Sequence, residues 1–206
     1  MVKLMNDIYV YSNGVLRNKL GIKDENKLKQ AESDFVIVRL KHILQSDEFD
    51  FSVKGYKRLH EEMFQDIYPF AGQIRKVDIY KNERLLSDLP MPFVPVKQIP
   101  EELKRCFKTY IKDFNDYTDK EKVEIIRNFM SSVWQVHPFR EGNTRSIITY
   151  SLKYAKSSNL GLDQKLILDN FAYIRDALVM SAYNKNEYLD EILLDSVERG
   201  KNNVRY

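Results

Sequence analysis

The chain has 206 residues, of which 43% are hydrophobic, and its 33 basic and 30 acidic side chains leave a net charge of only +3. This length and composition favour one compact domain over residues 1–206, and the even mixing of the two charges argues against a nucleic-acid groove. The lone Cys106 excludes an internal disulfide. Without a basic-then-apolar leader or an apolar run of ~18 residues, we expect a cytoplasmic protein with no membrane span.

Helical periodicity dominates the chain. The first predicted helix carries Leu28, Ala31, Phe35 and Val38 on one apolar stripe. Good N-cap residues, or a proline followed by acidic residues, precede several of the predicted helices. These helices run from Asp24 through Leu44, Ser52 to Phe64, Pro100 through Phe114, Asp119 to His137, Thr144 to Ser158, Phe171 to Ala182 and Leu189 to Val197. The predicted fold class is all-α.

One segment, between residues 70 and 100, breaks the helical pattern. It contains the alternating stretch "IRKVDIY", a polar turn at residues 81–83 and four of the six prolines. This pattern predicts a small exposed β-hairpin, or flap, at about residues 72–90, followed by an extended connector. Because an isolated hairpin is marginally stable, we expect the flap to lie on the helical body or on a partner.

The stretch "HPFREGNTRS", which begins at His137, carries the chemistry. His137 continues an apolar helical face by one step of four, and Pro138 then disfavours further helix. The next helix begins near Arg145, so its N-terminus points at the loop between the two helices, over residues 137–145. A helix N-terminus with an arginine in its first turn suits phosphate, and Glu141 suits Mg²⁺ bound together with substrate phosphates.

A neutral imidazole at His137 is suited to accept a proton from an incoming hydroxyl, and we expect the negative end of its helix to favour the resulting imidazolium. This is phosphoryl- or nucleotidyl-transfer chemistry. The sequence has no "GxxxxGK[ST]" P-loop, and "HEEMF" at His60 lacks the second histidine of a zinc protease. We interpret His42 and His60 as structural or surface residues, since neither has ligand partners nearby.

These residues resemble a known family. "HPFREGNTR" is similar to the signature HxFx[D/E]GNxRxxR of the Fic family, whose members transfer AMP from ATP to a hydroxyl group of a target protein. "YPFAGQIRKVDIYKNE" resembles the family's flap, which clamps the target segment, and "GVLRNKLGI" resembles a stretch that precedes its first long helix. The resemblance spans most of residues 9–155 and implies ATP and Mg²⁺ as cofactors.

The resemblance also implies roles for individual residues. His137 is expected to be the catalytic base, Phe139 a core anchor and Glu141 the Mg²⁺ ligand. Target docking is assigned to Ile79 and Tyr80 of the flap. The expected contacts to ATP and its phosphates come from Arg140, Glu141, Gly142, Asn143, Thr144, Arg145, Lys81, Asn82, Arg17 and Asn18.

The sequence departs from the family pattern at two positions. Thr144 replaces a smaller residue, and Ile148 stands where the second arginine of the motif is expected to meet the terminal phosphate. We expect an arginine placed at 148 to face the phosphate, although the spacing also permits a core position. The family's inhibitory motif [S/T]xxxE[G/N], whose glutamate pairs with that second arginine, is absent from the chain.

The sequence therefore predicts a protein adenylyltransferase that modifies a Tyr, Ser or Thr hydroxyl, as a bacterial toxin controlled by a separate small antitoxin that supplies an inhibitory glutamate helix. An enzyme with no inhibitor is the other option for regulation. Three alternatives stay open for the site itself: a polar network that only fixes two helices, a weakened nucleotide-binding module, and an enzyme that transfers another phosphate-containing group.

Overall fold

Side-chain caps fix where several helices begin. Asp24 and Ser52 each accept a hydrogen bond from the N–H three residues further on, and Thr118 forms a capping box with Glu121. The structure, a computed structural model, describes residues 7–86, 89–114 and 116–203. Over those residues it contains eight α-helices: α1 (Glu25–Gln45), α2 (Val53–Phe64), α3 (Ile99–Tyr110), α4 (Asp119–Val136), α5 (Asn143–Ser157), α6 (Gln164–Asp169), α7 (Phe171–Ser181) and α8 (Glu187–Asn203).

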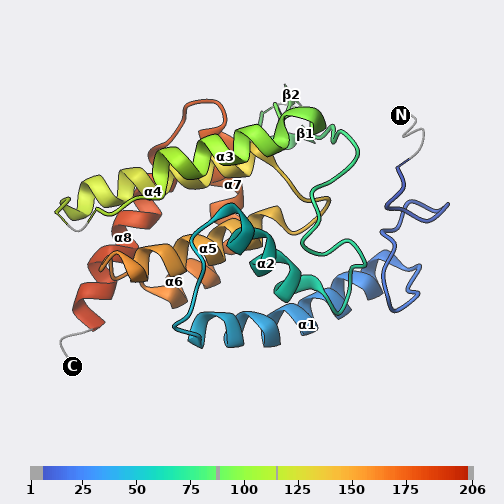
Figure 1. Cartoon of the computed structure of the whole chain (residues 1–206), viewed down its shortest axis with the longest axis horizontal. Helices are drawn as coiled ribbons and strands as arrows, with labels where there is room; N and C mark the ends of the chain where they lie inside the picture. The colour runs from blue at the N-terminus through green and yellow to red at the C-terminus, as the bar shows by residue number, and fades with distance from the viewer. Residues whose placement is uncertain (1–6, 87–88, 115, 204–206) are drawn as a thin grey trace.

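Helix α5 runs through the middle of the molecule (Figure 1). On one side it contacts α1 and α2, and on the other it contacts α4, which carries α3. Helices α7 and α8 pack on α4, and α6 contacts both. The side chains of α5 from Ser146 to Ala155 are all buried, as expected of a central helix. The Tyr150 ring meets those of Tyr56, Phe107 and Phe129 from α2, α3 and α4. The predicted all-α class is confirmed.

The flap has less regular structure than the alternating sequence predicted. Its strands, β1 (Asn82–Glu83) and β2 (Leu89–Pro90), pair antiparallel over two residues each. Residues 74–80 form no strand, and residues 81–83, the predicted turn, lead into and form β1. Residues 87 and 88 of the predicted flap lie outside the described residues. The hairpin is confirmed, but its predicted strand and turn are wrong.

A buried arginine explains why residues 74–80 do not pair as a strand. The Arg75 guanidinium donates hydrogen bonds to the carbonyls of Val77 and Val94. This one side chain therefore links the two sides of the flap's base, where a β-hairpin would use backbone hydrogen bonds between its strands. Sequence alternation does not reveal such an arrangement.

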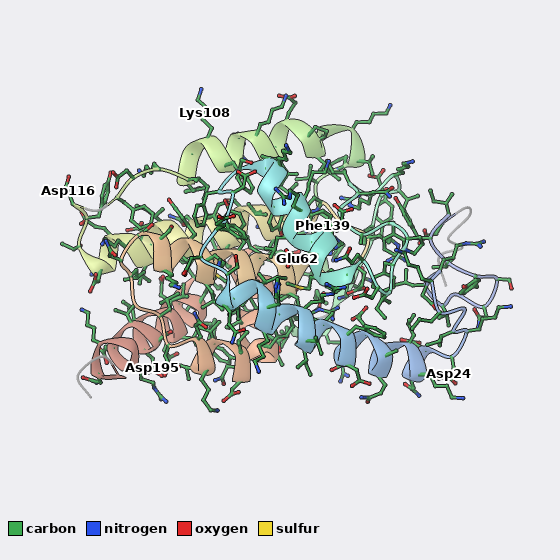
Figure 2. The ribbon with its side chains drawn as sticks, turned by 60° about the horizontal axis from the view of Figure 1, so that its bottom comes forward. Asp24, Glu62, Lys108, Asp116, Phe139 and Asp195 are labelled. Carbon is green, nitrogen blue, oxygen red and sulfur yellow. The ribbon has the colours of Figure 1, made fainter. Side chains whose placement is uncertain are left out.

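Helix α1 packs along only part of the predicted stripe. Leu28 is buried and Ala31 is partly buried against the core, as predicted, but Phe35 and Val38 are 40% and 69% exposed, and Val36 is buried in their place. The run "DFVIVRL" offers two overlapping apolar stripes, and the contacts of α1 with α2 and α5 select between them. Figure 2 shows Asp24 at the start of this helix.

Helix α3 ends at Tyr110, earlier than the predicted Phe114. The Tyr154 hydroxyl of α5 accepts a hydrogen bond from the Lys112 N–H at 3.0 Å and lies within 2.9 Å of the carbonyls of Tyr110 and Lys112. This side chain satisfies the backbone that would otherwise continue the helix.

A lysine ties α5 to the end of α1. The buried Lys153 Nζ donates to the Ile43 carbonyl at 3.2 Å and also to the Ser46 carbonyl. A cation at these last carbonyls is favoured by the helix dipole. The C-terminal end of α1 is therefore fixed to the central helix.

The structure bears on two expectations from composition. Cys106 is buried, and burial raises the pKa of its thiol to about 11, which fits an unreactive core residue. Among the described residues, no helix is both long and apolar enough to cross a bilayer.

Candidate active site

The predicted signature loop lines a cavity of about 650 Å³ between the flap, the end of α4, the start of α5 and α7. The flap, the signature loop and the start of α5 each contribute lining residues. The lining residues are Asp7, Asp78, Ile79, Tyr80, Lys81, Trp134, His137, Arg140, Glu141, Gly142, Asn143, Thr144, Arg145, Phe171 and Arg175. Most of the predicted site residues thus meet in one cavity.

His137 caps the C-terminus of α4 in a left-handed conformation, with φ 48°. Its Nδ1 lies 3.1 Å from the Trp134 carbonyl, which has no proton to give, so Nδ1 carries the hydrogen and Nε2 keeps a free lone pair. The ring stacks on Phe93 with centroids 3.9 Å apart. The histidine is therefore held as the tautomer that a general base requires.

Burial lowers the pKa of His137 to about 3, against a smaller opposing effect of the Trp134 carbonyl, and nearby cations lower it further. The expected preference of the helix end for the imidazolium is therefore outweighed by the loss of water around the ring. His137 is neutral near pH 7, which is the form that accepts a proton.

The loop after His137 is braced from inside. The Asn143 side chain accepts from the Phe139 N–H at 2.9 Å and donates to the Phe139 carbonyl at 2.8 Å. Phe139 is buried beside α2 (Figure 2). Since the Asn143 amide is used by the loop, only its backbone N–H is left to serve the predicted phosphate site.

His60 of α2 supports the same loop. Its Nε2–H donates to the Glu141 carbonyl at 2.9 Å, and its Nδ1 accepts from the Gly72 N–H at 2.8 Å. The ring stacks on Phe139, with centroids 3.8 Å apart. Burial lowers the pKa of His60 to about 3, so it is neutral and structural. This confirms the structural reading, although the sequence did not indicate that His60 supports the loop.

Gly142 is the N-cap of α5 and requires glycine. Its φ is 79°, and a Cβ atom there would lie 2.4 Å from the Phe64 ring. No side chain caps the helix at this residue. The first turn of α5 therefore presents backbone N–H groups at the cavity, an arrangement suited to phosphate.

The charged side chains of the loop already have partners. Arg145 Nη2 lies 2.5 Å from Glu32 Oε1 on α1 and 3.6 Å from Glu141 Oε1. Arg140 binds Asp7 through two nitrogens at 2.7 and 3.0 Å. A phosphate that approaches Arg145 must therefore compete with Glu32.

Glu141 is the one predicted metal ligand. Its side chain is 42% exposed, faces the cavity and accepts from the Gly142 N–H at 3.0 Å. Among the described residues, no three His, Cys, Asp or Glu side chains cluster to hold a metal ion. This single carboxylate fits a cation that takes its other ligands from phosphates and water, as Mg²⁺ does.

Three predicted ATP contacts do not line the cavity. The Asn18 amide binds the Leu16 and Ile22 carbonyls and the Ile22 N–H, so it folds its own loop. Arg17 lies over the Tyr11 ring, and Asn82 pairs with Pro90 in the hairpin. Arg17 and Asn18 are therefore not among the residues that line this cavity, and their contact with the nucleotide stays a prediction.

Ile148 also differs from expectation. It is 1% exposed and faces an apolar cavity beside Arg145 instead of the phosphate cavity. The favoured placement of position 148 on the phosphate side is therefore wrong. The register of α5, which begins at Asn143, turns this residue toward α1.

Several residues of the site were missed from the sequence. Trp134 lies one helical turn before His137, and its Nε1–H donates to the Thr144 hydroxyl at 2.9 Å. This spacing was a usable signal. Asp7, Phe171 and Arg175 come from distant segments, and nothing in their local sequence indicates the site.

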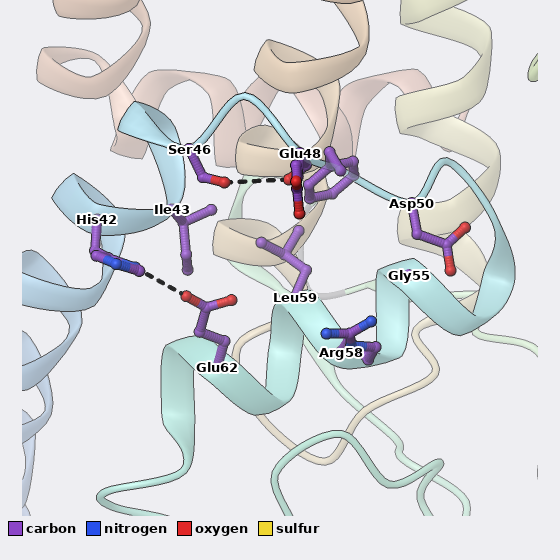
Figure 3. A pocket seen from close by; sticks show the side chains of 10 residues that line it. His42, Ile43, Ser46, Glu48, Asp50, Gly55, Arg58, Leu59 and Glu62 are labelled. Atoms are coloured by element: carbon purple, nitrogen blue, oxygen red, sulfur yellow. Dashed lines mark hydrogen bonds and ion pairs between the residues drawn. The ribbon is translucent and has the colours of Figure 1, made fainter.

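A second cavity, of about 470 Å³, lies between the end of α1 and the start of α2 (Figure 3). His42 points at Glu62 across it, with 3.2 Å between Nδ1 and Oε1. Both side chains are exposed to solvent. This arrangement fits the surface reading of His42.

The sequence of this chain is similar to those of known proteins. Residues 50–152 match the model of the Fic/DOC family. Protein adenylyltransferase VbhT of Bartonella schoenbuchensis is 30% identical over 162 residues, 77% of this chain and 32% of the relative. Probable protein adenylyltransferase y4lH of Sinorhizobium fredii is 28% identical over 153 residues, 73% of this chain and 75% of the relative. This chain thus spans about a third of the first relative's length and three quarters of the second's.

The fold has counterparts among solved structures. BepC protein from Bartonella tribocorum, with bound AMPPNP, matches with a TM-score of 0.76 at 23% identity, over 94% of this chain and 97% of that one. Together with the family match over half of the sequence, this shows that the chain belongs to the Fic/DOC family.

Proposed function

We propose that the chain is a protein adenylyltransferase, which transfers AMP from ATP to a Tyr, Ser or Thr hydroxyl of a target protein. One observation carries the proposal. His137, whose Nε2 keeps a free lone pair, and the uncapped N-terminus of α5 line the same cavity, beside the exposed flap. A base, a phosphate site and an edge for a polypeptide are the three parts that this reaction needs.

The step follows from these parts. The target hydroxyl oxygen attacks the α-phosphorus of ATP while His137 Nε2 takes the hydroxyl proton. A bond forms between the target oxygen and the α-phosphorus, and the bond from that phosphorus to the bridging oxygen breaks. Pyrophosphate leaves with the electron pair of that bond. The low pKa of His137 keeps the base free of a proton before the attack.

ATP and Mg²⁺ are the proposed cofactors. Two relatives are named as adenylyltransferases, and the matching BepC structure contains AMPPNP. The first turn of α5, with Thr144 and Arg145, would hold the phosphates. Glu141 would hold Mg²⁺ together with those phosphates, and the ion supplies charge neutralisation when bound.

The flap is the proposed docking edge for the target. Ile79, Tyr80 and Lys81 line the cavity ahead of β1, and Tyr80 is 81% exposed. An extended target segment that binds along these residues would bring its hydroxyl toward His137.

The test is transfer of label from ATP to protein in a cell lysate with Mg²⁺. ATP labelled at the α-phosphate should label a target with the wild type and not with His137→Ala. Label from the γ-phosphate, or from UTP labelled at its α-phosphate, would show that another group is transferred. Mass spectrometry of the labelled protein then identifies the acceptor residue.

A nucleotide-binding module without transfer is the second candidate. The buried Ile148 and the Glu32 partner of Arg145 favour it, because both leave fewer cations for the terminal phosphate. ATP binding by calorimetry, without label transfer to any protein in the lysate, would decide for this module.

We also propose that a separate small protein inhibits the enzyme as an antitoxin, since the chain lacks the motif [S/T]xxxE[G/N]. A mostly apolar cavity of about 790 Å³ between α1, α5 and α6 reaches Arg145 and would accept part of a helix. The toxin role predicts that expression of the wild type in bacteria stops growth and that His137→Ala does not. Normal growth with active wild type would exclude it.

We propose that residues 1–206 act as one Fic-like domain, of which the family model covers 50–152. Because the proposed reaction consumes ATP, we place its action in a cytoplasm.

A further inference from the structure

The Arg75 side chain is fully buried, and each of its three guanidinium nitrogens donates to a backbone carbonyl. Its Nε donates to the His137 carbonyl at 2.8 Å, its Nη1 to the Val77 carbonyl at 2.8 Å, and its Nη2 to the Val94 carbonyl. Its own N–H donates to the Pro138 carbonyl at 2.8 Å. One side chain therefore joins three segments that are far apart in the sequence.

These three segments carry the base and the two sides of the flap that the proposed reaction uses. His137 is the proposed base, and Val77 is followed at once by the cavity-lining residues of the flap. Val94 is on the returning side of the flap, where its N–H donates to the Gln135 carbonyl at 3.2 Å. Phe93, next to it, stacks on the His137 ring. Arg75 thus lies where both sides of the flap's base meet the end of α4.

The charge of Arg75 is only weakly compensated. The nearest carboxylate, Asp78, is 3.6 Å away and 47% exposed. Burial lowers the pKa of Arg75, which reflects the cost of holding a cation there. Apolar packing often holds two segments together at least as well as a buried charge. What an apolar side chain cannot do is fix three carbonyls at once in one plane.

We propose that Arg75 is a positioning residue for AMP transfer, which sets the distance between the target held on the flap and the imidazole of His137. This inference rests on the proposed function for its activity readout. It predicts that loss of Arg75 damages the transfer step more than ATP binding, because Arg75 contacts no residue of the α5 N-terminus.

Arg75 also belongs to the charges that face His137. Arg75, Lys81 and Arg140 all lower the pKa of His137, and the carboxylates of Asp7, Asp78 and Glu141 line the same cavity. Removal of the Arg75 charge should therefore raise the pKa of His137, whereas lysine should keep it low. The pKa of His137 in these variants therefore distinguishes a role of Arg75 beside the base from a purely structural role.

The experiment compares Arg75→Met and Arg75→Lys with a matched control, Lys122→Met. Lys122 is also a buried cation that donates to a carbonyl, that of Ser158 at 3.1 Å. It lies 15 residues before His137 on the same helix, about 22 Å away along its axis. The kcat and the KM for ATP are measured at a temperature at which circular dichroism shows each variant folded.

We expect Arg75→Met to lower kcat at least tenfold and to change the KM for ATP less than threefold. Arg75→Lys, which cannot form the planar fork, should lower kcat at least threefold. Lys122→Met should keep kcat within twofold even where its melting temperature falls. A kcat within twofold of wild type for Arg75→Met overturns the proposal. If that variant does not fold, the same result for Arg75→Lys overturns it.

A second readout does not need activity. The ring resonances of the three histidines are followed by NMR against pH, with His42→Gln and His60→Gln for assignment. His137 should titrate at higher pH in Arg75→Met than in wild type or Arg75→Lys, and an unchanged titration in a folded Arg75→Met overturns the proposal. If the wild type binds ATP but labels no protein, the proposed function is refuted. The NMR titration of His137 then still tests whether Arg75 acts on that histidine.

Discussion

Arg145 of α5 is paired with Glu32 of α1, with 2.5 Å between Nη2 and Oε1. The same carboxylate accepts a hydrogen bond from the Tyr68 hydroxyl. Both charged side chains are largely buried, so the pair is screened less than a surface ion pair. Because Arg145 is the proposed phosphate ligand, the Glu32 carboxylate of α1 would compete with a substrate phosphate for it.

Glu32→Gln should therefore bind ATP more tightly. The amide keeps an acceptor for Tyr68 but removes the charge that competes for Arg145. A gain of about 1 kcal/mol, roughly fivefold in Kd, is expected by calorimetry. Glu25→Gln, on the same helix in an exposed pair with Lys29, is the matched control and should leave the Kd unchanged. Weaker ATP binding by Glu32→Gln would mean that Glu32 orients Arg145 instead of competing for it.

His137→Ala should lower AMP transfer by ~10²–10⁴-fold, because the base is lost while the phosphate site is kept. Alanine at φ 48° costs roughly 1–2 kcal/mol, so the variant should still fold. His42→Ala, at an exposed position, is the control and should label the target like wild type. Transfer by folded His137→Ala at the wild-type rate would remove His137 from the mechanism.

The stability of the protein should depend on His60 below neutral pH. Burial lowers the pKa of His60 from 6.5 to about 3, so between these values the unfolded chain binds a proton that the folded chain does not. The free energy of unfolding should therefore fall as the pH drops below 6.5, by roughly 2 kcal/mol for His60 at pH 5. Above pH 7 this contribution is constant.

Urea unfolding at pH 7.5 and pH 5 measures this dependence. His60→Gln should show a smaller loss of stability between the two values than wild type, since His137 is then the one imidazole with a lowered pKa that is left among the three histidines. His42→Gln, whose histidine is exposed, should match wild type. An equal loss in all three proteins would contradict the neutral, buried state of His60.

Ile79→Pro should impair target modification and spare ATP binding. The variant removes an N–H donor from the flap, and no described residue accepts a hydrogen bond from that N–H. A loss of about tenfold or more in target labelling, with an unchanged Kd for ATP, is expected. If ATP binding and thermal stability fall together with labelling, the proline has damaged the fold and the flap is not an edge for the target.

Ile148→Arg should destabilise the protein. Position 148 is 1% exposed, so a guanidinium there would lose most of its water. The two carboxylates of the neighbouring cavity, Glu32 and Asp169, are already paired with Arg145 and Lys165. A loss of about 3 kcal/mol or more in the free energy of unfolding is expected. Ile148→Leu, which keeps the volume, should cost less than about 1.5 kcal/mol. A stable Ile148→Arg variant that binds ATP more tightly would show that a side chain at position 148 reaches the phosphates.

The sequence predicted the signature loop well because its determinants are adjacent in the chain. Helical spacing up to His137, the following Pro138 and the Gly142–Asn143 pair locate a helix end, a turn and a helix start within ten residues. The structure places these elements as predicted. Local signals of this kind predict structure well because they arise from the conformational limits of the backbone and do not depend on contacts with distant segments.

The rest of the site depends on contacts between distant segments. Glu32 and Asp7 reach the arginines of the loop across 113 and 133 residues of sequence, and no spacing rule predicts such pairs. The same limit explains the flap, where one buried side chain, Arg75, replaces the expected ladder. Sequence periodicity reports which side chains are apolar, and packing decides which of two apolar faces is buried.

The lysine contact at the end of α1 constrains any rotation of that helix relative to α5. Lys153 holds the carbonyls of Ile43 and Ser46, while Glu32 lies 11 residues before Ile43, about 16 Å along the axis. This contact fixes the C-terminal end of α1 to α5. A rotation of only about 7° there would withdraw the Glu32 carboxylate by roughly 2 Å, enough to break its contact with Arg145.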